Sequence, residues 1–119
     1  AVLHAGWRGL AGGVVQAGVR ALRRLGAAGE LSAAIGPGAG GCCYEAGAEI
    51  HAAFADVPEA LDGRCVDLPT VARVRLAGAG VAGIAELGIC TICSDPHLLF
   101  SHRRDSGVTG RQAGLIWLT

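Results

Sequence analysis

Apolar residues recur at helical spacing in three stretches of the chain, and each stretch predicts a helix. The first covers residues 9–25 and ends where arginines complement the helix dipole and Gly26 permits a left-handed turn. The second covers residues 43–54. The third covers residues 70–87, and its closely spaced glycines are expected to break it in two.

Short apolar runs between these stretches predict strands at residues 1–3, 31–35, 64–67, 89–92, 98–104 and 112–118. Turns are predicted at residues 58–63 and 105–110 because glycine, proline and acidic residues gather there. Helices and strands alternate without an internal repeat, so the pattern favours an α/β or α+β fold.

The start of the chain is unusual because three apolar residues lead directly to His4. They read as the end of a buried strand that delivers a polar side chain to a site, and the chain contains no methionine. We therefore expect residues 1–119 to be the C-terminal portion of a single longer domain whose N-terminal part is missing. His4 is then a metal ligand or a satisfied core histidine.

Composition and charge limit the classes of partner. Ten basic residues, all of them arginine, balance ten acidic residues, so no basic surface for nucleic acid or an anionic membrane is expected. No uninterrupted apolar run approaches the length of a membrane span. The cysteines number five, an odd count that favours a reduced, cytoplasmic setting over a disulfide framework.

Two cysteine and glycine motifs each admit several interpretations. Gly36, Gly38 and Gly41 match a dinucleotide-binding loop, but Pro37 removes one backbone donor, and a tight turn explains the same glycines. The C-x-x-C at residues 90–93 suits half of a zinc site, a redox pair or small buried thiols. The adjacent Cys42 and Cys43 have the wrong spacing for a second zinc half-site.

A cluster of arginines near the end of the chain is the candidate anion site. Arg103, Arg104 and Arg111 lie close together in sequence, either on a solvated turn or around a bound phosphate. We predict that these three bind substrate phosphate, with Arg8 as a weaker candidate.

Several segments together resemble one family. They are residues 4–9 (His-Ala-Gly-Trp-Arg-Gly), 35–37 with 42–45, 67–68, 90–93, 100–105 (Phe-Ser-His-Arg-Arg-Asp), 109–111 and 115–118. Their order along the whole chain resembles the YfiH-like family of purine nucleoside phosphorylases, formerly described as polyphenol oxidases or multicopper laccases.

The resemblance implies an α+β domain with a layered αββα fold. It also implies a mononuclear zinc site built by two histidines and a cysteine: His4 is one of the histidines, and the other histidine and the cysteine lie upstream. No cysteine of this chain fills that gap, and the catalytic residues stay unassigned. The implied reaction is phosphorolysis of adenosine, inosine or guanosine to base and ribose 1-phosphate, with adenosine deamination as a second activity.

Other functions compete with this interpretation. A set of histidine and cysteine ligands also suits copper, so a copper-dependent polyphenol oxidase is one alternative. An inactive fragment that lacks most of the metal site is another. A dinucleotide-binding module, based on the glycine loop, is the third.

Overall fold

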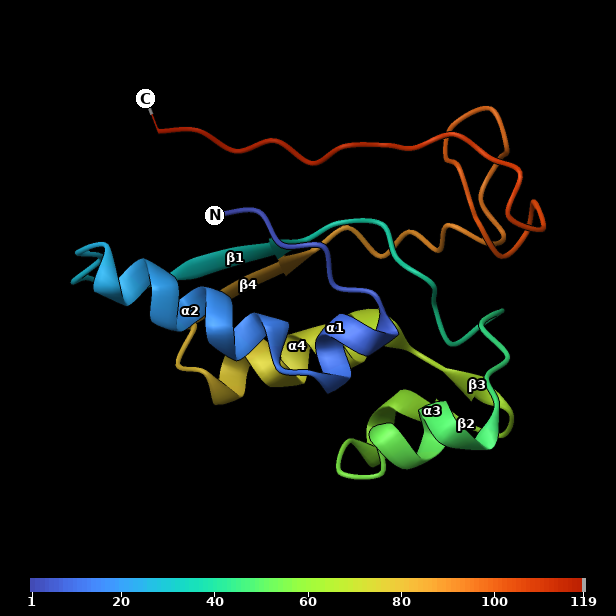
Figure 1. Cartoon of the computed structure of the whole chain (residues 1–119), viewed down its shortest axis with the longest axis horizontal. Helices are drawn as coiled ribbons and strands as arrows, with labels where there is room; N and C mark the ends of the chain where they lie inside the picture. The colour runs from blue at the N-terminus through green and yellow to red at the C-terminus, as the bar shows by residue number, and fades with distance from the viewer. Residues whose placement is uncertain (119) are drawn as a thin grey trace.

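The computed structural model describes residues 1–118 and contains helices, a short 3₁₀ helix and two small sheets (Figure 1). In chain order the elements are α1 (Trp7–Ala11), α2 (Val14–Arg24), β1 (Ser32–Ile35), α3 (Ala48–Ala53), η1 (Pro58–Ala60), β2 (Leu61–Asp62), β3 (Cys65–Val66), α4 (Leu68–Gly78) and β4 (Gly83–Glu86). This is the α+β class that the sequence predicts. Within these residues no helix combines the length and apolar character needed to cross a bilayer.

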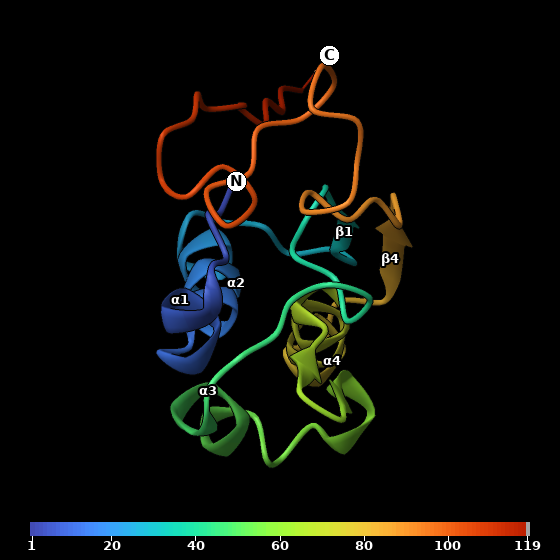
Figure 2. The same cartoon turned by 90° about the vertical axis from the view of Figure 1, so that its right-hand side faces the viewer.

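The main sheet is a parallel pair formed by β1 and β4, with Ser32 opposite Gly83 and Ile35 opposite Glu86. Helix α4 leads into β4 and packs against both strands, as a parallel connection requires. Side chains alternate along β1, so Ala33 and Ile35 are half-buried while Ser32 and Ala34 are exposed. Residues 112–118 lie on the other side of this sheet from α4 (Figures 1 and 2).

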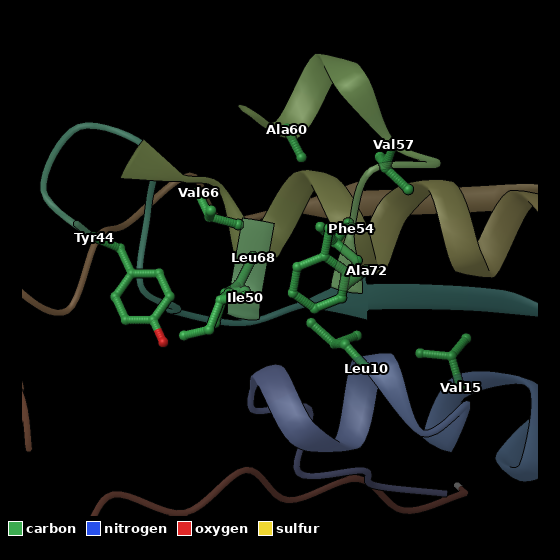
Figure 3. Close-up of a cluster of buried hydrophobic side chains, with 11 residues drawn as sticks. Leu10, Val15, Tyr44, Ile50, Phe54, Val57, Ala60, Val66, Leu68 and Ala72 are labelled. Carbon is green, nitrogen blue, oxygen red and sulfur yellow. The ribbon is translucent and has the colours of Figure 1, made fainter. Parts of the chain in front are cut away.

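The hydrophobic core lies between α1, α3, η1 and α4. Phe54, Val57, Val66 and Val71 are completely buried, and Leu10 of α1 points toward Phe54 (Figure 3). Most of these side chains are of modest size, in keeping with an aromatic content of only 4%. Close approach of the short helices therefore builds the core.

Local backbone chemistry decides where α2 and α4 begin. Gly13 has a left-handed φ of 81°, which divides the predicted helix 9–25 into α1 and α2. Asp67 caps α4 by accepting hydrogen bonds from the Thr70 amide (3.4 Å) and hydroxyl (3.1 Å). The third predicted helix is present only as far as Gly78. Gly80 (φ 82°) turns the chain, and residues 83–86, predicted as the second part of that helix, form β4 instead.

The predicted helix 43–54 is shorter in the structure because its first residues pair with another segment. The amide of Ala46 donates to the Arg64 carbonyl, and the Val66 amide donates to the Tyr44 carbonyl. Those backbone groups are therefore unavailable to a helix, and α3 begins only at Ala48.

The strand predictions at 31–35 and 64–67 are confirmed, whereas those at 1–3, 98–104 and 112–118 are wrong. The last strand before the C-x-x-C lies at 83–86 rather than 89–92, and Cys90 makes only an isolated bridge to Gly38. A strand needs a neighbouring backbone to pair with, and the segments without one stay irregular within residues 1–118. Apolar character alone does not make a segment a buried strand: Trp117, in the predicted strand 112–118, is 74% exposed.

Arg104 organises the loop that replaces the predicted strand 98–104. Its Nε and Nη2 atoms donate to the Asp105 carboxylate at 2.7 and 3.0 Å. Nη1 donates to the carbonyls of Thr91 (3.2 Å) and Ser94 (3.3 Å), and Nη2 also donates to the Leu99 carbonyl (2.9 Å). All five N–H groups of this guanidinium are therefore used within the chain.

The Asp105 carboxylate is the counterpart of this guanidinium. Its hydrogen bond with Arg104, together with those from the Thr109 hydroxyl (2.9 Å) and the Ser101 amide (3.3 Å), lowers the pKa of Asp105 to about 2. The carboxylate thus stays charged throughout the ordinary pH range. Because its folded-state pKa is depressed, its contribution to stability is present above the unfolded pKa and is lost as the pH falls through about 2.

Truncation of the most buried aromatic residue tests the core. Phe54→Ala should lower the free energy of unfolding by about 3–5 kcal/mol, because it leaves a cavity among fully buried neighbours. Leu25→Ala is the control, since Leu25 is 85% exposed and its loss should change stability by less than about 0.5 kcal/mol. Urea unfolding of both variants measures the difference, and equal effects would contradict this core assignment.

Removal of the Asp105 charge tests the loop. Asp105→Asn should lower the thermal midpoint at pH 7, and its deficit relative to the unmodified protein should shrink as the pH falls to about 2. The control is Asp62→Asn, because Asp62 is exposed and makes no side-chain hydrogen bond within residues 1–118. Thermal unfolding followed by circular dichroism at pH 7, 4 and 2 measures the effect. A deficit that does not change with pH would contradict the role of the charge.

Candidate metal and anion sites

The first residues of the chain run in extended form against α2 and place His4 beside the start of α1. The close contact between Leu3 and Gly18 sets this path, because a Cβ atom added to Gly18 would lie 2.5 Å from Leu3 Cδ1. His4 is exposed to solvent, so the core formed by residues 1–118 does not include it. It lines an open hollow of about 320 Å³ together with Gly6, Trp7, Arg8 and Gly9.

This hollow offers a metal only part of a coordination shell. A catalytic zinc takes three protein ligands, usually histidine, cysteine or a carboxylate. Of the residues that line the hollow, only His4 carries such a group. Within residues 1–118, His4 belongs to no group of three or more candidate ligands. These residues therefore do not form a zinc site at His4 by themselves.

Arg103 is the arginine whose position best suits an anion. Its Nη1 donates to the Glu45 carbonyl at 3.0 Å, and its guanidinium lies 4.8 Å from the centre of the Tyr44 ring. The side chain is exposed and makes no other hydrogen bond within residues 1–118. Two contacts thus orient the guanidinium while leaving most of its donors accessible.

The other predicted arginines are arranged differently. Arg104 has no N–H group left for a ligand, since all are bonded within its loop. Arg111 is exposed and its Nη1 folds back onto the carbonyls of Thr109 (3.3 Å) and Gly110 (2.9 Å). Arg8 stacks 4.6 Å from the centre of the neighbouring Trp7 ring. None of the three predicted arginines lines the hollow at His4.

The glycine loop is a packing element rather than a dinucleotide loop. A Cβ on Gly38 would lie 3.1 Å from Pro69 Cγ, and one on Gly41 would lie 3.1 Å from Asp67 Cβ. Both glycines therefore let the loop approach the start of α4. The next helix begins only at Ala48, so no helix N-terminus faces the loop to bind a phosphate.

The structure brings four cysteines together and corrects the expectation that Cys42 and Cys43 are wrongly spaced for half of a metal site: their sulfur atoms lie 3.3 Å apart and face the C-x-x-C. The sulfur atoms of Cys42, Cys43, Cys90 and Cys93 all lie within 4.8 Å of one another, and such a cluster could hold a metal ion. The bridge between Gly38 and Cys90 sets the two loops side by side. The sequence signal for this cluster is that each cysteine pair follows the carboxyl end of a strand in the same parallel sheet. The predicted strand at 89–92 put Cys90 inside a strand instead of after one, so the sequence did not indicate that the two pairs meet.

The thiols differ in acidity within this cluster. Partial burial of Cys90 opposes its ionisation, but hydrogen bonds from the backbone amides of Cys93, Gly40 and Ile92 outweigh it and lower the pKa of this thiol to about 7. The hydrogen bond with the Cys43 thiol raises the pKa of Cys42. One member of the cluster is thus substantially thiolate near neutral pH.

Comparison with known proteins gives a consistent result along the whole chain. Residues 1–119 match the family described as multi-copper polyphenol oxidoreductase laccase. A purine nucleoside phosphorylase of Pseudomonas aeruginosa is 43% identical over 128 residues, which cover 99% of this chain and 51% of that protein. A purine nucleoside phosphorylase of Xylella fastidiosa (strain Temecula1) is 42% identical over 130 residues, covering 98% of this chain and 48% of its own length.

A third relative carries the family name that the sequence blocks resemble. The purine nucleoside phosphorylase YfiH of Shigella flexneri is 36% identical over 126 residues, which cover 99% of this chain and 50% of that protein. The chain spans about half the length of the curated relatives it matches. It belongs to the multi-copper polyphenol oxidoreductase laccase family, of which YfiH-like proteins are members.

Proposed function

We propose that this chain is part of a purine nucleoside phosphorylase. The observation that carries the proposal is that relatives matching nearly the whole chain at 36–43% identity are named as purine nucleoside phosphorylases. The proposed substrates are inorganic phosphate and adenosine, inosine or guanosine. The products are the free base and ribose 1-phosphate.

The reaction places specific demands on an anion site. A phosphate oxygen attacks C1′ of the ribose while the bond from C1′ to the base nitrogen breaks. The bonding electrons leave with the base, which takes up a proton, so positive charge builds on the ribose in the transition state. The site must therefore hold phosphate close to the sugar in a fixed orientation.

Arg103 is the proposed phosphate-binding residue because its guanidinium is oriented before any ligand arrives. The Glu45 carbonyl and the Tyr44 ring hold it, and its remaining donors suit two phosphate oxygens. Arg111 is proposed as a second contact, since it is exposed and its own contacts are local. Arg104 contributes indirectly by ordering the loop on which Arg103 lies.

His4 is proposed as the one ligand that this chain supplies to the catalytic metal, with zinc as that metal. Bound zinc would supply Lewis acidity and, for deamination of adenosine, an activated water. The exposed position of His4 in an open hollow is compatible with further ligands from elsewhere in the whole protein. Adenosine deamination is the proposed second activity, and the cytoplasm is the proposed location.

A copper-dependent polyphenol oxidase is the second candidate because the matching family is described by that activity. The two functions differ in reagents: phosphorolysis needs phosphate and no oxidant, whereas phenol oxidation needs copper and dioxygen. Phosphorolysis and phenol-oxidation assays of the natural protein, meaning the full protein that contains this chain, separate the two functions when it is prepared without added copper. Assaying residues 1–119 beside the natural protein tests the remaining alternative, that this chain by itself is inactive.

Substitution of Arg103 tests the phosphate role. In the natural protein Arg103→Ala should raise the KM for phosphate about 10- to 100-fold, because a charge-assisted hydrogen bond is worth about 1.5–3 kcal/mol. Initial rates with inosine at varied phosphate concentration give this constant.

Two further variants test whether the geometry of the Arg103 side chain, and not only its charge, is needed for phosphate binding. Arg103→Lys keeps the charge but loses the planar fork, so its phosphate KM should lie between those of the alanine variant and the unmodified protein. Arg73→Ala removes an exposed arginine of α4 and should leave the constant unchanged. An unchanged phosphate KM in Arg103→Ala would refute the assignment of Arg103.

A further inference from the structure

The four-cysteine cluster has the dimensions of a tetrahedral thiolate site. Zinc binds thiolate sulfur at about 2.3 Å, which places the sulfurs of a tetrahedron about 3.8 Å apart. Cys42 Sγ lies 3.3 Å from Cys43 Sγ and 3.7 Å from Cys93 Sγ. Because all the sulfurs lie within 4.8 Å of one another, shifts of about an ångström would complete the tetrahedron.

Backbone features outside the cysteines allow this convergence. A Cβ on Gly40 would lie 3.3 Å from Cys90 Cβ and 3.6 Å from Cys42 Sγ, so a larger residue at position 40 would crowd the cluster. The Gly40 amide also donates to Cys90 Sγ at 3.4 Å. Amides directed at a cysteine sulfur stabilise it as a thiolate, which is the form that binds metal.

The turn that carries Cys90 and Cys93 is held from outside as well. The Ser94 amide donates to the Cys90 carbonyl at 3.1 Å, which closes the turn. Arg104 donates to the carbonyls of Thr91 and Ser94 at 3.2 and 3.3 Å. Such outer contacts fix the direction of metal ligands, so Arg104 is a positioning residue for the cysteine turn.

From this geometry we propose that Cys42, Cys43, Cys90 and Cys93 bind a zinc ion in a closed tetrathiolate site, separate from His4. The donor set selects a soft or borderline cation, and zinc accepts four thiolates in a tetrahedron. With every position occupied by protein, the ion has no open site for substrate and its role is structural. It ties the loop after β1 to the loop after β4.

This proposal is independent of the proposed phosphorylase function. The catalytic metal would involve His4, which lies in a different part of the chain and shares no ligand group with the cysteines. Loss of the cysteine-bound ion is therefore measurable as metal content, optical spectrum and stability, whatever the activity of the protein.

Metal content of the natural protein, purified under reducing conditions with zinc present, is the first test. Cys90→Ser combined with Cys93→Ser should lose one zinc equivalent per chain relative to the unmodified protein. Cys65→Ser is the matched control, because Cys65 lies outside the cluster and should keep the full zinc content. Equal zinc content in the double variant and the unmodified protein would overturn the proposal.

A second measurement needs no variant and so does not depend on one folding correctly. Cobalt added to metal-free natural protein should give the intense thiolate-to-cobalt charge transfer and visible bands of a tetrahedral sulfur site, and zinc should abolish them. Bound zinc should also protect four thiols from a thiol reagent and raise the thermal midpoint. Absence of the sulfur bands, or a Cys42–Cys93 disulfide in the reduced preparation, would overturn the site.

Discussion

The parallel pairing of β1 with β4 is the constraint on which the rest of this structure depends. Its register sets Ser32 opposite Gly83, and the bridge between Gly38 and Cys90 continues the pairing beyond the strands. Because carboxyl ends of parallel strands lie at the same edge, two loops far apart in sequence emerge side by side. The cysteine cluster lies there, while α4 packs on one face and joins the sheet to the core.

Arg104 shows how one side chain can link several parts of a small domain. The residue type and its neighbours suggested a ligand-binding arginine, but its guanidinium joins the cysteine turn, the segment near Leu99 and the Asp105 carboxylate. A planar group with five donors suits this role because it can satisfy several backbone carbonyls at once. The neighbouring Arg103 is held by only two contacts and keeps its other donors accessible.

The two candidate metal-binding regions differ in what they can do. His4 lines an open hollow in which no other lining residue carries a metal-binding group, and it belongs to no group of three or more candidate ligands within residues 1–118. The cysteine cluster offers four donors within 4.8 Å of one another, so an ion bound by all of them would have no open position for substrate. An open shell permits chemistry, whereas a closed shell permanently joins the segments that supply the ligands.

Sequence periodicity and glycine spacing alone determined the main helical stretches, the class of fold, the strand within 31–35 and the break near Gly80, because these depend on local spacing and backbone freedom. The division of the predicted helix 9–25 at Gly13 came only from the structure. The ordered sequence blocks likewise determined the family. Tertiary structure decided which apolar runs become strands, since a strand exists only where another backbone pairs with it. It also decided that Cys42 and Cys43 meet Cys90 and Cys93, because their distance in space follows from the register of β1 and β4 and not from their spacing along the chain.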